Sequence, residues 1–167
     1  MRYLDITYPD VNNGEGTRVT LWVAGCLHHC PGCHNPESWD INGGKEFEES
    51  DKNKLFSELS NPYIDGFTIS GGEPLMYKNE LIELLNDLKT SFPDLNIWIY
   101  TGYTLYLDYI KHYYDLFRNI DVVVDGHYIK DLRDTSLAFR GSSNQRLIDI
   151  KKSLNENKLI EYEKSLY

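Results

Sequence analysis

The stretch WVAGCLHHCPGCHNPESW, residues 22–39, starts at the end of an apolar run and continues into a loop rich in glycine and proline. It contains Cys26, Cys30 and Cys33, which are all the cysteines of a chain of 167 residues. Short runs of β-branched and aromatic residues bounded by glycine are typical of buried strands. The stretch therefore predicts a strand that carries three thiols into the loop at its carboxyl end.

The same order of an apolar run and a glycine-containing polar turn recurs along the chain. The runs, each with its following turn, are VTLWVA (19–24) before GCLHHC, GFTIS (66–70) before GGEP, NIWIY (96–100) before TGYT, and DVVVD (121–125) before GHY. Each run has the length and composition of a buried strand. Four strands are therefore predicted, and every unusual motif follows one of them directly.

Helical patterns lie between these runs. One apolar stripe at helical spacing consists of Leu81, Leu84, Leu85 and Leu88. A second such stripe consists of Leu107, Ile110, Tyr114 and Phe117. Ser50, ahead of DKNKLFSEL, is a candidate cap for a third helix. The chain is thus expected to alternate strands and helices.

Alternating strands and helices indicate an α/β fold with a mostly parallel sheet and right-handed crossovers. A complete barrel of eight such units takes about 250 residues, so a chain of 167 residues predicts a partial, open β/α barrel. We expect a single domain over residues 1–167, with 151–167 as a peripheral tail. Sites in such sheets lie at the carboxyl ends of the strands, where the motifs are.

The chain carries 17 lysines and arginines against 26 aspartates and glutamates, a formal net charge of −9. Proteins that bind phosphate backbones use clustered basic residues, so this composition argues against nucleic acid as a partner. No run approaches the roughly 18 apolar residues of a membrane span, and MRYLDITYPD lacks the apolar core of a signal peptide. We therefore expect a cytoplasmic protein with no membrane partner.

Clustered thiols in a reducing compartment indicate a metal site or catalysis, and an odd cysteine count argues against a disulfide framework. One interpretation is zinc, with His28, His29 or His34 as the fourth ligand. The other is a [4Fe–4S] cluster, which ordinarily uses four thiolates, so that three leave one iron open. Zinc sites usually add a second, distant pair of ligands, and the chain has no second cysteine pair. The spacing favours the cluster and leaves zinc as the alternative.

The C-x3-C-x2-C loop resembles the signature of radical S-adenosylmethionine (SAM) enzymes, and SGGEPL (70–75) resembles their second motif. Four stretches are similar to a narrower family, the anaerobic ribonucleoside-triphosphate reductase activating enzymes. They are NGEGTRVTLWVAGCLHHCPGCHNPESW, WIYTGYT, VVVDGHY and FRGSSNQR, and they span residues 13–146. The resemblance implies the open partial barrel of radical SAM enzymes.

The resemblance also implies the chemistry of the site. Cys26, Cys30 and Cys33 would bind a [4Fe–4S] cluster as metal ligands and catalytic residues, and the fourth iron would bind the methionyl group of SAM. One-electron reduction would cleave SAM to a 5′-deoxyadenosyl radical. Because this reaction needs a low cluster potential, an external reductant such as flavodoxin is expected.

Further cofactor-binding residues are expected around the cysteines. Glycines let the main chain approach a ligand closely, so GGEP contributes Gly71, Gly72, Glu73 and Pro74. An aromatic residue commonly precedes the third cysteine in radical SAM enzymes. Here Gly32 stands at that position and the ring is that of His34, so Gly32 and His34 are both candidates for the adenine side of the site.

Four other motifs add candidates of lower specificity. Thr101 and Asp125 stand at strand ends, where SAM binding and ordinary turn formation both explain them. The glycines of NNGEGTR (12–18) are either turn residues or an edge of the site. RGSSNQR (140–146) is either a contact with adenosine or the partner protein, or an ordered polar loop.

The sequence thus predicts an activating enzyme that generates a glycyl radical on anaerobic (class III) ribonucleoside-triphosphate reductase. The partner would be that reductase as a protein substrate, because a minimal open barrel has little material to enclose a small molecule. The alternatives are an activase of another glycyl-radical enzyme such as pyruvate formate-lyase, a small-molecule enzyme of the deazapurine pathway, and a zinc-stabilised adaptor without enzymatic activity.

Overall fold

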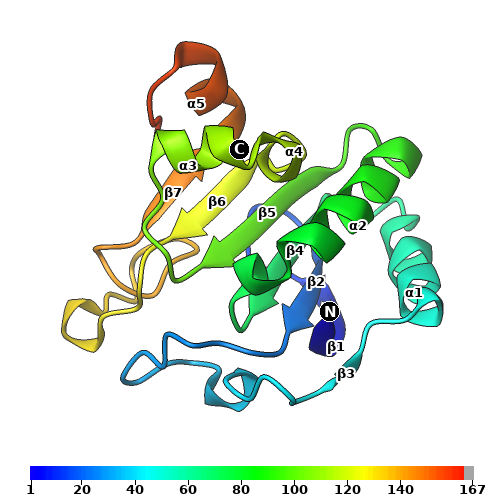
Figure 1. Ribbon diagram of the computed structural model, residues 1–167, viewed down its shortest axis with the longest axis horizontal. Helices are drawn as coiled ribbons and strands as arrows, with labels where there is room; N and C mark the ends of the chain where they lie inside the picture. The colour runs from blue at the N-terminus through cyan, green and yellow to red at the C-terminus, as the bar shows by residue number, and fades with distance from the viewer. Residues whose placement is uncertain (164–167) are drawn as a thin grey trace.

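The structure, a computed structural model, describes residues 1–163 of the chain. Within those residues seven strands form one sheet in the order β3-β1-β2-β4-β5-β6-β7 (Figure 1). They are β1 (Arg2–Asp10), β2 (Arg18–Val23), β3 (Lys45–Glu46), β4 (Gly66–Gly71), β5 (Asn96–Thr101), β6 (Val122–Asp125) and β7 (Arg146–Asp149). The edge strands β3 and β7 do not pair with each other, so the sheet is open and does not close into a barrel.

The centre of the sheet is parallel. β2 pairs with β4, β4 with β5 and β5 with β6, all in parallel register. β1 runs antiparallel to β2, β3 runs antiparallel to β1, and β7 runs antiparallel to β6. This arrangement confirms the predicted α/β fold with a mostly parallel, open sheet. It also brings the carboxyl ends of β2, β4, β5 and β6 to one edge.

The α-helices pack on one face of the sheet (Figure 1). They are α1 (Glu49–Leu59), α2 (Lys78–Ser91), α3 (Leu107–His112), α4 (Tyr114–Phe117) and α5 (Ile150–Glu156). Short 3₁₀ turns form η1 (Pro36–Ser38), η2 (Pro74–Tyr77) and η3 (Lys130–Leu132). The predicted stripe of α2 is confirmed, because all four of its leucines are buried. Burying each leucine stabilises the fold by roughly 1.5–3 kcal/mol.

Within residues 1–163, no α-helix packs on the opposite face of the sheet. Along β5, Ile97 and Ile99 belong to the helix-side core, whereas Trp98 points to the other face and belongs to a separate cluster. Phe139 and Tyr162 contact Trp98 edge-on, with ring centroids 5.2 and 5.3 Å away. A loop and the C-terminal segment up to Tyr162 thus pack on this face.

Two details of the predicted helices are wrong. The stripe over residues 107–117 is divided between α3 and α4, because Tyr113 leaves the helical conformation with φ −102° and ψ 40°. Tyr114 is consequently exposed, and Leu116 is buried beside Phe117. Ser50 does not cap α1. The cap is Glu48, whose side chain and that of Asp51 form a reciprocal capping box.

The segment expected as a tail, 151–167, contains most of α5 and then turns back to the sheet. Asn157 ends the helix in the left-handed conformation, and Glu161 forms an isolated bridge with Ile148. The Tyr162 hydroxyl donates to Glu15 across the structure at 3.0 Å. Residues 164–167 of this prediction lie outside the described residues. No helix within residues 1–163 is long and apolar enough to cross a bilayer.

Candidate functional site

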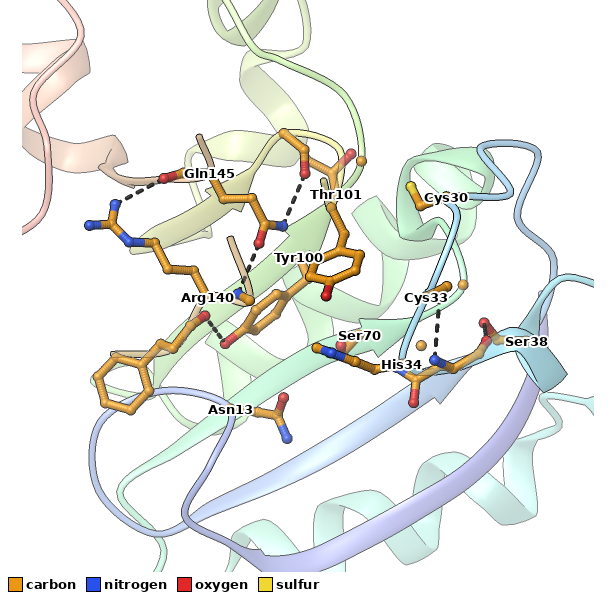
Figure 2. A pocket seen from close by; sticks show the side chains of 18 of the residues that line it. Asn13, Cys30, Cys33, His34, Ser38, Ser70, Tyr100, Thr101, Arg140 and Gln145 are labelled. Atoms are coloured by element: carbon orange, nitrogen blue, oxygen red, sulfur yellow. Dashed lines mark hydrogen bonds between the residues drawn. The ribbon is translucent and has the colours of Figure 1, made fainter. Parts of the chain in front are cut away.

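A cleft of about 540 Å³ lies at the carboxyl edge of the parallel strands. The loop after β2, the ends of β4 and β5, the β1–β2 loop and the loop after β6 all contribute to its wall. Cys30, Cys33 and His34 lie on one side, and Arg140 and Gln145 lie on the opposite side (Figure 2). The volume suits a ligand of small-molecule size.

The cysteine loop is fixed at both of its ends. Where β2 ends, the Gly25 N–H donates to the Ser38 carbonyl at 2.8 Å and the Cys26 N–H to the Trp39 carbonyl at 3.2 Å. Between the second and third cysteines, the Cys33 N–H donates to the Cys30 carbonyl at 3.0 Å and closes a turn. Gly32 has φ +76° in this turn, a conformation that favours glycine.

The three thiols are unpaired, half-buried and all on the cleft wall. Burial raises the pKa of the Cys26 thiol, an effect that the backbone N–H groups of His28 and His29 partly offset. Burial likewise raises the pKa of the Cys30 thiol. The Cys33 sulfur accepts a hydrogen bond from the Asn35 N–H at 3.3 Å. The loop thus directs main-chain N–H groups toward sulfur, as anionic thiolates require.

Both glycines of the GGEP motif line the cleft and pack closely on the end of β2. Gly71 has φ +98°, and a Cβ there would lie 2.6 Å from the Val23 carbonyl oxygen. A Cβ on Gly72 would lie 2.3 Å from the Gly25 carbonyl oxygen. The absence of side chains at Gly71 and Gly72 therefore lets the end of β4 pack against the backbone at the end of β2, and it also leaves main chain exposed in the cleft.

Glu73 and Pro74 are buried and lie behind the cleft wall. The Glu73 carboxylate accepts hydrogen bonds from the Leu75 N–H at 2.9 Å and the Gly102 N–H at 2.8 Å. The Thr101 hydroxyl donates to the same carboxylate at 2.8 Å. Direct contact between Glu73 and a ligand in the cleft would require rearrangement of these bonds.

Thr101 lines the cleft, whereas Asp125 is fully buried beside it. The Arg146 guanidinium contacts both Asp125 oxygens, at 2.9 and 2.5 Å, and the Leu105 N–H donates to the same carboxylate at 2.7 Å. The pKa of Arg146 is raised by its hydrogen bond to Asp125. Asp125 thus joins the loop after β5 and the start of β7 to the end of β6, and both of its oxygens are hydrogen-bonded.

The RGSSNQR segment is an ordered polar loop. The Gln145 side chain accepts from the Gly141 and Ser142 N–H groups at 2.9 and 3.1 Å and donates to the Gly126 carbonyl at 3.0 Å. Arg140 and Gln145 also line the cleft. In the β1–β2 loop, Asn12 and Asn13 of NNGEGTR contribute to the cleft wall, whereas Gly14 and Gly16 are not among its lining residues.

Two tyrosines of the wall were not among the predicted site residues. The Tyr128 ring lies 4.8 Å from the His34 ring, and both residues line the cleft. The Tyr100 hydroxyl donates to the Phe139 carbonyl at 2.8 Å. Strand alternation in NIWIY places Tyr100 on the helix-free face and was an available signal. The position of Tyr128 depends on the path of a loop, which no local pattern encodes.

The donor set suits an iron–sulfur cluster. Sulfur ligands select soft centres such as Fe–S clusters, and the thiols here are free, close to N–H donors and open to one cleft. Within residues 1–163, no three His, Cys, Asp or Glu side chains converge on one point as they would on a single metal ion. A four-iron cluster offers a separate iron to each thiolate, so ligands spread along one wall fit it.

Comparison with known proteins also points to an iron–sulfur site. A family model described as a 4Fe-4S single cluster domain matches residues 12–148. The anaerobic ribonucleoside-triphosphate reductase-activating protein of Escherichia coli (strain K12) is 40% identical over 147 residues, covering 83% of this chain and 92% of that protein. The protein of that name from Enterobacteria phage T4 is 42% identical over 146 residues, covering 86% and 91%. The chain belongs to the anaerobic ribonucleoside-triphosphate reductase-activating protein family.

A further member of this activating-protein family, from Haemophilus influenzae, is 41% identical over 150 residues, 87% of this chain and 96% of that protein. The matched cluster domain includes every residue of the cleft wall except Val11. The similarity therefore covers all of the cleft wall but Val11 and is not confined to the cysteine loop.

Proposed function

We propose that this member of the activating-protein family is a radical SAM enzyme that generates a glycyl radical on an anaerobic ribonucleoside-triphosphate reductase. The observation that carries the proposal is the set of three free thiols on one wall of a cleft at the carboxyl ends of parallel strands. The proposal is supported by about 40% identity to proteins named for the activation of that reductase.

Cys26, Cys30 and Cys33 would hold a [4Fe–4S] cluster and leave its fourth iron open to SAM. When bound, the cluster supplies the electron that cleaves SAM to methionine and a 5′-deoxyadenosyl radical. The N–H groups directed at the sulfurs would stabilise the anionic thiolates, which tunes the cluster potential. An external one-electron donor of the flavodoxin type would supply the electron. A reducing compartment such as the cytoplasm suits thiols of this kind.

The rest of the wall would orient SAM. Gly71 and Gly72 present main chain without side chains, which suits the polar methionyl end. The rings of His34 and Tyr128 offer apolar surfaces for the adenine, and the Thr101 hydroxyl adds a polar group at the end of β5. Holding SAM in one orientation turns a collision into an intramolecular step.

The open side of the cleft would admit a peptide segment of the reductase. One hydrogen atom would move from a glycine Cα to the 5′-deoxyadenosyl radical, which yields 5′-deoxyadenosine and leaves the unpaired electron on the glycine. Because the sheet does not close into a barrel, no strand of the chain blocks this approach within residues 1–163. The reductase itself would complete the site and exclude water from it.

Replacement of one cysteine tests this proposal. Cys26→Ala removes one of three cluster ligands, so we expect labile iron and sulfide to fall severalfold and 5′-deoxyadenosine formation from SAM to fall to background. Leu27→Ala is the matched control, because Leu27 lies in the same loop with 71% of its surface exposed. Stoichiometric zinc without labile sulfide in the anaerobically purified protein, or full SAM cleavage by Cys26→Ala, would contradict the proposal.

A further inference from the structure

His28 stands between the first two cysteines and has surroundings unlike those of its neighbours. Its side chain is 10% exposed, whereas Leu27 is 71% exposed. A polar ring on a loop at the mouth of a cleft is ordinarily solvated, so the burial of this ring needs a reason. The reason is that the ring, which lines the cleft wall, also packs against side chains of the loops at the strand ends.

Three strand-end loops meet the His28 ring. Its Nε2 lies 2.7 Å from the Glu73 carboxylate, in the loop after β4. The Tyr103 ring, in the loop after β5, lies 4.6 Å away, and the His127 ring, in the loop after β6, lies 4.4 Å away. The His28 side chain thus joins the cysteine loop to the loops after β4, β5 and β6.

Gly102 makes room for this ring. A Cβ on Gly102 would lie 2.4 Å from His28 Cδ2, and the three atoms nearest to it all belong to His28. The backbone of Gly102 does not require glycine, since its φ lies outside the left-handed region. The His28 ring therefore gives a steric reason for the absence of a side chain at Gly102, which also lines the cleft.

The partner of His28 is itself immobile. Glu73 is 1% exposed, and its carboxylate is held by the Thr101 hydroxyl and by the Gly102 and Leu75 N–H groups at 2.8–2.9 Å. The contact with this fixed carboxylate holds the His28 ring in one position. The cysteines on either side of His28, Cys26 and Cys30, acquire a fixed position relative to the end of β4.

We propose that His28 is a positioning residue that sets the distance between the cysteine loop and the Gly71–Gly72 backbone. This inference rests on the proposed function, in which SAM meets the open iron and that backbone at the same time. Both contacts form only if the cysteine loop and the Gly71–Gly72 backbone are held at a fixed distance from each other. Loss of the His28 side chain should therefore weaken SAM binding more than it weakens cluster binding. Glu73 then acts through His28 and not by contact with SAM.

Titration of SAM into the reduced, cluster-loaded protein tests this inference. We expect His28→Ala to retain the cluster and to bind SAM at least about tenfold more weakly, the effect of losing one hydrogen bond to a charged group. The electron paramagnetic resonance (EPR) signal of the cluster should also respond less to SAM. His28→Gln, whose amide can still donate to Glu73, should restore binding to within about threefold. SAM binding and an EPR response by His28→Ala equal to those of the unmodified protein would overturn the inference.

A second variant tests the same geometry with every side chain of the cysteine loop in place. Gly102→Ala displaces the His28 ring and should weaken SAM binding by about tenfold in the unmodified background. In the His28→Ala background, Gly102→Ala should weaken SAM binding by less than about twofold, because the His28 ring atoms that the new Cβ would contact are absent. Additive effects of the two substitutions would overturn the inference, because Gly102 would then act without His28.

The outcomes separate this inference from the proposed function. If the unmodified protein assembles a cluster and cleaves SAM while both variants match it, the positioning role of His28 is wrong and the proposed function stands. If the unmodified protein binds no cluster, both are wrong. Leu27→Ala, in the same loop but exposed, should behave as the unmodified protein in every measurement.

Discussion

Single residues hold the cleft together through contacts made behind its wall. Glu73 and Asp125 carry the only two carboxylates that are at most 1% exposed within residues 1–163, and each stands at the end of a parallel strand. Glu73 accepts from the loop after β5, and Asp125 accepts from Arg146 at the start of β7. A buried carboxylate is stable only when it is fully bonded, so both residues fix the loops that they contact.

The burial of the thiols leads to a prediction on their reactivity. Burial raises the pKa values of Cys26 and Cys30 above the usual 9.0, so less thiolate is present at neutral pH and alkylation should be slow. In the cluster-free protein, we expect iodoacetamide to modify both residues severalfold more slowly at pH 7.5 than in urea. The difference should shrink as the pH approaches 10. Mass spectrometry of the labelled peptides measures both rates, and equal rates in folded and unfolded chains would contradict the prediction.

A comparison of two glycines tests the close packing at the end of β4. Gly71→Ala places a Cβ 2.6 Å from a backbone oxygen at φ +98°. Backbone strain at this φ and the steric clash of the Cβ therefore both lower the stability of the fold. Gly126→Ala has φ +103° but no atom nearer than 3.5 Å, so only the strain remains. We expect losses of about 3 kcal/mol or more for Gly71→Ala and about 1 kcal/mol for Gly126→Ala. Urea unfolding measures both, and equal losses would contradict the packing argument.

At the scale of elements, β6 and β7 are joined by an ion pair as well as by their ladder. Arg146→Met would leave Asp125 buried with one N–H donor, so we expect a loss of about 2–3 kcal/mol in the free energy of unfolding. Arg118→Met is the matched control, because Arg118 pairs with Asp115 where both are exposed, and it should cost less than about 0.5 kcal/mol. Similar losses for the two variants would contradict a structural role of the buried pair.

The elements that were predictable from the sequence are those with a strong local pattern. The four parallel strands are runs of apolar residues buried on both faces, and α2 has a regular stripe of leucines. β1, β3 and β7 were not predicted. β3 has two residues and β7 has four, and such short strands exist through their partners more than through their own residues. The division of 107–117 into two helices depends in the same way on tertiary packing.

The residues of the candidate site also differ in whether a local sequence pattern predicts them. The cysteines, the paired glycines and Thr101 were predictable because short motifs place them directly after strands, and all of them lie on the cleft wall. The buried positions of Glu73 and Asp125 were not predictable, because they depend on partners 28 and 21 residues away in the chain. The same holds for the place of His28, whose contacts come from three separate loops.

On the scale of the whole molecule, the open sheet and the cleft at its carboxyl edge fit an enzyme that acts on another protein. Helices cover one face of the sheet (Figure 1), and the cleft lies at the edge where the parallel strands end. The closing of the active site would then come from the reductase. The radical would accordingly form on a glycine of that partner.

The most direct measurement is EPR spectroscopy of an anaerobic mixture. The reduced, cluster-loaded protein would be incubated with SAM and the candidate anaerobic ribonucleotide reductase, and 5′-deoxyadenosine would be quantified in the same sample. We expect a glycyl-type doublet on the reductase with a matching amount of 5′-deoxyadenosine, and neither signal with Cys26→Ala. SAM cleavage without a doublet, or no cleavage by a protein with a confirmed cluster, would contradict this expectation.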